Sequence, residues 1–316
     1  MDNKQAQSLS IVVPVYNSAN TLELLVSRLG TVLSQVTDQF EVILVNDGSN
    51  DLSWETIQGL GKIYPFIVGI NLMRNYGQHN ALLCGTRAAN YEVVITMDDD
   101  LQHPPEEIPN LLKKLAEGYD VVYGSPKKMP HSFFRNIASR ITKMLLAMVM
   151  GIKSIREIGS FRAFRTNLRR AFATYQSPGV ILDVLLSWGT TRFTSIYVEE
   201  NKREVGKSNY TFGKLIGQAF LILTGYSTIP LRFSSWIGFG FTVFGMVIFL
   251  YVVILYFTKG SIPGFPFLAS IISLFSGTQL FALGIMGEYL AQVFDRSTDR
   301  PPYIIGNVIR NNQSSK

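Results

Sequence analysis

Short apolar runs rich in β-branched residues alternate with stretches of helical spacing between residues 10 and 124. The apolar runs, which predict buried strands, are 10–15, 41–45, 67–72, 94–98 and 121–124. The stretches between them, which predict amphipathic helices, are 21–33, 54–64, 80–89 and 105–118. Strands that alternate with helices of this length predict an α/β fold with a mainly parallel sheet that is covered on both faces.

Four of these strands are followed by a polar cluster. The clusters begin at Asn17, Asp47, Asn75 and Asp98. Because the carboxyl ends of parallel strands lie at one edge of a sheet, and ligands bind beyond that edge, the clusters predict one shared site. A dinucleotide site would need a Gly-x-Gly-x-x-Gly loop after the first strand, and residues 14–20 contain no glycine, so that class of site is excluded.

The pattern changes after residue 124. Residues 132–150 place apolar side chains at helical spacing, opposed by Arg135, Arg140 and Lys143. A basic amphipathic helix of this kind lies in the membrane interface, and an ordinary core-packed helix fits the same spacing. We expect a further strand at 192–198, which closes an α/β domain spanning residues 1–210. A second amphipathic segment, 211–230, is expected to run along the membrane surface.

Two long apolar segments then follow. Phe233–Thr258 and Gly260–Gly287 contain no charged residue, and each exceeds the roughly 20 residues that cross a bilayer. They predict a transmembrane hairpin within 231–290, the alternative being a buried hairpin of a large soluble protein. Basic residues flank both outer ends, which places the α/β domain and the tail, 291–316, in the cytoplasm. These flanking residues are Arg232, Arg296, Arg300 and Arg310.

Composition and charge narrow the choice of partner. Apolar residues make up 47% of the chain and charged residues 16%, a balance shifted toward membrane proteins. The net charge is +6, and the basic residues gather ahead of the apolar segments, which favours an anionic membrane surface over nucleic acid. Cys84 is the only cysteine, so no intrachain disulfide is possible. The polar first ten residues lack the apolar core of a signal peptide, and we expect the α/β domain to stay in the cytosol.

Three consecutive carboxylates, Asp98, Asp99 and Asp100, end the fourth strand and mark the strongest candidate for chemistry. Anions packed this closely repel one another, and a bound divalent cation relieves the repulsion. Asp98 and Asp100 with Gln102 form an oxygen-only ligand set that suits Mg²⁺ or Mn²⁺ holding the phosphates of a substrate. An acidic turn that caps the next helix explains the same residues without a metal.

Several motifs together resemble glycosyltransferase family 2, and within it the polyprenyl-phosphate glycosyltransferases. This group includes dolichol-phosphate mannosyltransferase, the bactoprenol glucosyltransferases and the enzymes that load a modified aminoarabinose on undecaprenyl phosphate. The similar stretches cover nearly the whole chain and are 12–17, 46–49, 74–79, 98–109, 203–210, 287–289 and 300–303. The Gln-x-x-Arg-Trp signature of the processive synthases is absent.

The resemblance implies a GT-A (Rossmann-like) fold and a nucleotide-sugar donor, with a UDP-sugar favoured. The residues that it places around the donor are Pro14, Tyr16, Asn17, Asp47, Gln78, Asp98 and Asp99. Asp47 suits the uracil N–H or a ribose hydroxyl, although an Asp-Gly turn would also explain it. Asp99 would contact sugar, ribose or only a backbone N–H, and His79 ranks low because a histidine at a helix start more often caps or packs.

On the acceptor side, the resemblance implies a polyprenyl phosphate held by Arg203, Lys207 and Ser208. Membrane-surface attraction alone is the alternative for the two basic residues. Asp100, Glu157 and Arg203 are expected to act in the reaction itself. Glu157 departs from the aspartate usual in the family, and its spacing to the following Arg-Ala-Tyr-like strand, here 162–164, is one residue shorter.

These expectations combine into an inverting transferase that moves one sugar to undecaprenyl phosphate at the inner membrane, for a cell-envelope glycan or lipid. Two helices alone enclose no flipping pathway, so a separate flippase is expected unless a homo-oligomer builds one. A catalytically inactive scaffold that binds nucleotide-sugar, and a transferase to another lipid such as diacylglycerol, remain the alternatives. The Asn-Tyr-Gly-Gln-His stretch leans toward aminoarabinose, while glucose, N-acetylglucosamine and mannose stay open.

Overall fold

The computed structural model describes residues 7–126, 144, 146–151, 158–177, 179–199, 224–259 and 264–310. The chain divides into two compact units, one from residues 1–218 with 299–316 and the other from residues 219–298. The elements of the first unit are β1 (Leu9–Val15), α1 (Ala19–Val36), β2 (Phe40–Asn46), α2 (Ser53–Ile63), β3 (Ile67–Leu72), α3 (Gln78–Ala88), β4 (Val93–Thr96), η1 (Pro105–Glu107), α4 (Ile108–Ala116), β5 (Val121–Pro126), β6 (Arg162–Arg165), η2 (Thr166–Phe172), α6 (Leu182–Ser187), β7 (Phe193–Val198) and β8 (Ile305–Arg310).

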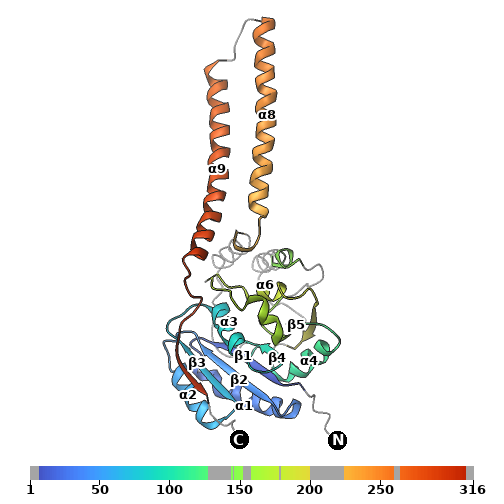
Figure 1. Ribbon diagram of the computed structural model, residues 1–316, viewed down its shortest axis with the longest axis vertical. Coiled ribbons are helices and arrows are strands. Elements are labelled where there is room, and N and C mark those ends of the chain that lie inside the picture. The colour runs from blue at the N-terminus through green and yellow to red at the C-terminus, as the bar shows by residue number, and fades with distance from the viewer. Residues whose placement is uncertain are drawn as a thin grey trace. The chain divides into compact units, whose positions relative to one another are not determined.

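The strands of the first unit form a single sheet in the order β7-β5-β6-β4-β1-β2-β3-β8. Figure 1 labels β1 to β5 of this sheet. The neighbours β4, β1, β2 and β3 are parallel, as are β5 and β7. Two strands run antiparallel: β6, which is inserted between β4 and β5, and β8 at the outer edge beside β3. The predicted α/β fold with a mainly parallel sheet is confirmed.

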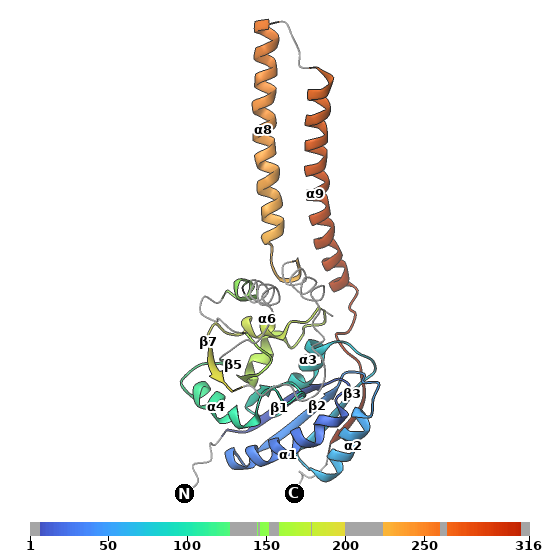
Figure 2. The same cartoon turned by 180° about the vertical axis from the view of Figure 1, so that it is seen from behind.

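Helices cover both faces of the sheet. On one face, β1 packs with α1 and α4 in the main apolar core, because α1 repeats buried leucines at Leu22, Leu25, Leu29 and Leu33 along one stripe. On the other face, α3 packs against β1 and β2. Figure 2 shows α1 and α2 on one side of the sheet and α3 on the other.

Two details of the sheet differ from the sequence-based expectation. The strand β4 ends at Thr96, two residues before Asp98, so the expected strand end at Asp98 is wrong and the three carboxylates belong to a loop. Met97 still donates its amide hydrogen to Val12 O at 3.2 Å, but strand alternation no longer decides which way Asp98 and Asp100 point. The expected C-terminal tail contains a strand, β8, which pairs with β3.

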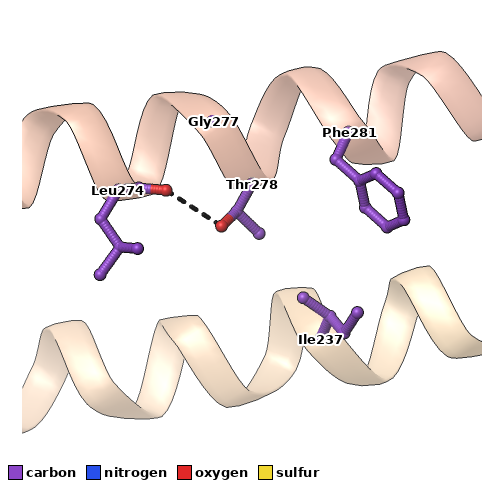
Figure 3. A pocket seen from close by; sticks show the side chains of 5 residues that line it. All are labelled: Ile237, Leu274, Gly277, Thr278 and Phe281. Atoms are coloured by element: carbon purple, nitrogen blue, oxygen red, sulfur yellow. Dashed lines mark hydrogen bonds between the residues drawn. The ribbon is translucent and has the colours of Figure 1, made fainter.

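The second unit contains two long helices, α8 (Ile229–Lys259) and α9 (Phe265–Ser297). Among the residues that the structure describes, one helical segment, Ile229–Thr258, is long and apolar enough to cross a bilayer. Its most apolar 18 residues have a mean hydropathy of 2.4, and none of them is buried. A groove of about 300 Å³ lies between the two helices, where Ile237 of α8 points toward Leu274, Thr278 and Phe281 of α9 (Figure 3). Most of the two expected surface helices, at 132–150 and 211–230, lies outside the described residues.

Candidate active site

Loops from four neighbouring strands meet at one edge of the sheet. Because β4, β1, β2 and β3 are adjacent and parallel, their carboxyl ends all lie there. Hydrogen bonds join these loops: the amide of Tyr16 donates to Asp99 Oδ2 at 3.2 Å, and the amide of Asn17 donates to Ser49 Oγ at 3.0 Å. The polar clusters that follow β1, β2 and β4 therefore form one connected surface.

Asp47 is a buried carboxylate that organises the loop after β3. Its Oδ1 accepts the amide hydrogen of Tyr76 at 2.7 Å, and its Oδ2 accepts that of Gly77 at 2.9 Å. Burial raises the pKa of Asp47, and these two amide hydrogen bonds offset part of that rise. Gly48 lets the loop approach closely, because it has a φ of +63° and an added Cβ would lie 2.4 Å from the Arg74 carbonyl carbon.

Among the residues that the structure describes, one donor binds each oxygen of the Asp98 carboxylate. Gln78 Nε2, at the start of α3, donates to Oδ1 at 2.7 Å, and Ser160 Oγ, just before β6, donates to Oδ2 at 2.6 Å. A carboxylate offers about four lone-pair positions, so each oxygen keeps one for a further partner. Asp98 is thus fixed in direction but still able to bind.

The two following carboxylates point to different neighbours. Burial raises the pKa of Asp99 to about 6; the charges of Asp98 and Asp100 add to the rise, and hydrogen bonds from Ser18 and the Tyr16 amide oppose it. Asp100 Oδ1 accepts the amide hydrogen of Gln102 at 3.2 Å. The electrostatics at this loop therefore favour neutralisation of negative charge.

Backbone strain is concentrated around the same edge. Asn17 and Leu101 have φ values of +54° and +60°, a region that side-chain-bearing residues adopt at a cost. Asn17 is supported there because its Oδ1 accepts the amide hydrogen of Asn50 at 2.8 Å. The side chain of Leu101 is 3% exposed, so packing holds the turn that follows Asp100.

A buried polar row lies beneath Asp98 and was not expected from the sequence. Arg162 pairs with Asp183 of α6, and its Nε donates to Thr96 Oγ1 at 3.0 Å. Tyr123 donates its hydroxyl to the same Asp183 at 2.7 Å. The side chain of Arg162 is 1% exposed, so this is a fully buried ion pair. Arg162, a charged residue between the apolar residues Phe161 and Ala163, was the one local signal that could have revealed the row.

The remaining expected residues occupy a variety of places. Pro14 is a buried residue of β1, opposite Val45 of β2, whereas Tyr16 is 41% exposed at the edge. His79 accepts the amide hydrogen of Leu182 at 3.4 Å, and burial lowers its pKa. The expected residues Glu157, Arg203, Lys207 and Ser208 lie outside the described residues.

The donor set at Asp98 and Asp100 is suited to a divalent metal held jointly with a substrate. Within the described part of the chain, no three histidine, cysteine, aspartate or glutamate side chains group into a site that could hold a metal ion. Mg²⁺ is commonly bound through one or two carboxylates together with substrate phosphates rather than by a protein cage. Asp98, which accepts one hydrogen bond on each oxygen from the described residues, and Asp100, two residues further along the same loop, fit that second arrangement.

Comparison with known proteins gives the same picture. The model of the family "Glycosyl transferase family 2" matches residues 10–173. A protein of Photorhabdus laumondii named undecaprenyl-phosphate 4-deoxy-4-formamido-L-arabinose transferase is 34% identical over 320 residues, which cover 100% of this chain and 98% of that protein. A protein of Proteus mirabilis with the same name is 34% identical, covering 97% of this chain and 95% of its own length.

Among solved structures, glucosyl-3-phosphoglycerate synthase from Mycobacterium tuberculosis, in complex with Mn²⁺, UDP and phosphoglyceric acid, is similar with a TM-score of 0.52. The identity is 16%, and the match covers 70% of this chain and 78% of that chain, so the likeness concerns the fold. The family match and the full-length relatives confirm the resemblance drawn from the motifs. This chain belongs to glycosyltransferase family 2.

Proposed function

We propose that this protein transfers a single sugar from a nucleotide-sugar to undecaprenyl phosphate at the cytoplasmic face of the membrane. The observation that carries the proposal is sequence similarity over nearly the whole chain to relatives that are each named as an undecaprenyl-phosphate sugar transferase. The site supports it, because Asp99 contacts Tyr16 after β1 and Asp98 contacts Gln78 after β3, at the edge where α/β sheets bind ligands.

The donor that we propose is a UDP-sugar. The likeness of fold to a synthase solved with Mn²⁺ and UDP supports the nucleotide, and the relatives' names make 4-deoxy-4-formamido-L-arabinose the first sugar to test. Tyr16, Asn17 and Gln78 line the edge on which the nucleotide would lie, and Asp47 would act by holding the loop at 76–77 beside it.

Asp98 and Asp100, with Gln102, would hold Mg²⁺ or Mn²⁺. When bound, the metal supplies positive charge to the diphosphate leaving group. The residues of the chain do the positioning: Gln78 and Ser160 fix Asp98, and Asp99 ties this loop to Tyr16. In this proposal the acidic loop orients the donor, and it donates and accepts no proton in the reaction.

The acceptor needs little help from a base. A phosphate monoester has a second pKa near 6 and is largely dianionic at neutral pH, so its oxygen is already a nucleophile. A bond forms from that oxygen to the anomeric carbon as the bond from this carbon to the diphosphate breaks, which inverts the configuration. Arg203, Lys207 and Ser208 would hold the acceptor phosphate, and Glu157 would orient the sugar or accept a proton.

We further propose that α8 and α9 form a membrane hairpin with both ends of the chain in the cytoplasm. The length and hydropathy of Ile229–Thr258 support the first span, and Arg232 and Arg296 stand on the outer flanks. A separate flippase would move the product, because two helices enclose no path, unless a homo-oligomer builds one.

The test is UDP release by membranes that contain the protein. We expect release only when a UDP-sugar, undecaprenyl phosphate and Mg²⁺ or Mn²⁺ are all present. Replacing undecaprenyl phosphate by diacylglycerol separates this function from transfer to another lipid. Nucleotide binding without turnover, for every sugar tried, would instead indicate an inactive scaffold.

A further inference from the structure

Ser160 lies beside Asp98, just beyond the paired residues of β4 and β6. Thr96 and Arg162 are paired residues of these antiparallel strands. Asp98 follows Thr96 by two residues and Ser160 precedes Arg162 by two residues, so both lie in loops outside the ladder, where a hydrogen bond joins their side chains. Both pairs are joined through their side chains, Arg162 Nε to Thr96 Oγ1 at 3.0 Å and Ser160 Oγ to Asp98 Oδ2 at 2.6 Å.

A hydrogen bond from Thr96 fixes the position of Ser160. Its backbone oxygen accepts the hydroxyl hydrogen of Thr96 at 2.7 Å, and Thr96 in turn accepts from Arg162. Arg162 is anchored by Asp183, which also accepts the hydroxyl hydrogen of Tyr123 at 2.7 Å. A continuous chain of hydrogen bonds thus runs from the buried Asp183 to the carboxylate of Asp98.

Gln78, the other donor to Asp98, is also connected to α6, the helix that contains Asp183. Gln78, which donates to Asp98 Oδ1, precedes His79, and His79 accepts the amide hydrogen of Leu182. Leu182 and Asp183 are neighbours in the first turn of α6. Both donors that orient Asp98 are therefore connected to α6. Replacing a buried ion pair by apolar residues is often neutral or stabilising, so stability alone does not explain the pair of Arg162 and Asp183.

We propose that Ser160 is a positioning residue, which together with Gln78 turns the free lone pairs of Asp98 toward the metal-bound diphosphate of the donor. The inference rests on the proposed function. It assigns to Ser160 an effect on metal affinity rather than on the folding of the sheet. Partners that orient metal ligands typically change metal affinity or activity by about 10- to 100-fold when they are removed.

The experiment is a titration of Mn²⁺ into the full-length protein in detergent with UDP present, with free Mn²⁺ measured by electron paramagnetic resonance. We expect Ser160→Ala to raise the dissociation constant of Mn²⁺ by about 10- to 100-fold, because the hydroxyl donor is lost while the backbone oxygen remains. Ser160→Thr keeps a hydroxyl and should restore affinity to within a few-fold of the wild-type value.

Ser34→Ala is the matched control. The Ser34 hydroxyl donates to Thr31 O at 3.0 Å on the exposed side of α1, away from the hydrogen bonds that hold Asp98, so its removal should leave Mn²⁺ affinity unchanged. If Ser160→Ala binds Mn²⁺ as tightly as the wild type, the inference is wrong while the proposed function stands. If the wild type binds no Mn²⁺ in the presence of UDP, the proposed metal site fails, and the inference fails with it.

Discussion

Replacing Asp47 by asparagine should loosen the loop after β3 and destabilise the protein. In the native structure each oxygen of Asp47 accepts one amide hydrogen, from Tyr76 at 2.7 Å and from Gly77 at 2.9 Å. Asparagine has one acceptor oxygen, so one hydrogen bond becomes neutral. Its NH₂ group then faces the second amide N–H, and that buried donor loses its partner.

The size of the effect follows from these two changes. A hydrogen bond to a charged group contributes about 1.5–3 kcal/mol, and an unsatisfied buried donor costs about 1–3 kcal/mol. Burial raises the pKa of Asp47, so the uncharged variant also escapes part of the cost of desolvating a carboxylate. We therefore expect a net loss of about 2–3 kcal/mol, or a fall of roughly 4–12 °C in the melting temperature of a domain of this size.

Thermal unfolding followed by circular dichroism, with UDP affinity measured by calorimetry on the same samples, checks this reasoning. Glu55→Gln is the control, because it makes the same carboxylate-to-amide change at an exposed position of α2 and should stay within about 0.5 kcal/mol of the wild type. We expect Asp47→Asn to lower both the melting temperature and UDP affinity. An unchanged melting temperature with weakened UDP binding would show that Asp47 contacts the nucleotide rather than the loop.

Three further predictions concern other parts of the chain. Asp100→Ala should abolish UDP release while leaving membrane insertion intact, and wild-type rates would mean that the metal is misplaced. Burial alone would raise the pKa of Asp120, but Arg192, Thr190 and Arg165 outweigh burial and lower the pKa below its ordinary value. The ionised carboxylate therefore stabilises the folded protein at a pH above the pKa of Asp120 in the unfolded chain. This contribution is lost as the pH falls through the lower pKa of the folded protein. Asp120→Asn should therefore lower the melting temperature at pH 7 and flatten its acid decline, and an unaltered pH profile would refute this. Gly69→Ala should cost about 1–3 kcal/mol, because its Cβ would lie 2.5 Å from Ile309 Cγ1; adding Ile309→Ala should return part of the loss, whereas strict additivity in thermal unfolding would exclude the contact.

The parts of the fold that were predictable are those with a long or repeated signal. Strands β1 to β5 follow apolar runs, and the helices between them repeat buried residues at helical spacing, as α1 does from Leu22 to Leu33. By contrast, β6 is four residues long with arginine at both ends, and β8 is largely exposed. Neither carries the apolar run that marks a buried strand, so the hydrophobic pattern alone does not predict them.

The candidate site divides in the same way. Asp98 was identifiable because three carboxylates in a row are costly unless something neutralises them. Ser160 was not, because a small polar residue has no local signature and gains meaning only when β6 pairs antiparallel with β4. The same holds for Asp183, whose partners Arg162 and Tyr123 lie 21 and 60 residues away in the sequence. Long-range register, rather than local pattern, determines these contacts.

Charge balance at the edge bears on how two anionic substrates would meet there. Asp98, Asp99 and Asp100 give this part of the site a negative character, and the buried charge of Arg162 beneath them is already paired with Asp183. A donor diphosphate placed beside three carboxylates would be repelled unless cations intervene. In the proposed reaction the metal and the basic pair Arg203 and Lys207 are therefore both needed, because each serves a different phosphate. Removing the metal should weaken donor binding, whereas neutralising Arg203 should weaken binding of the lipid phosphate.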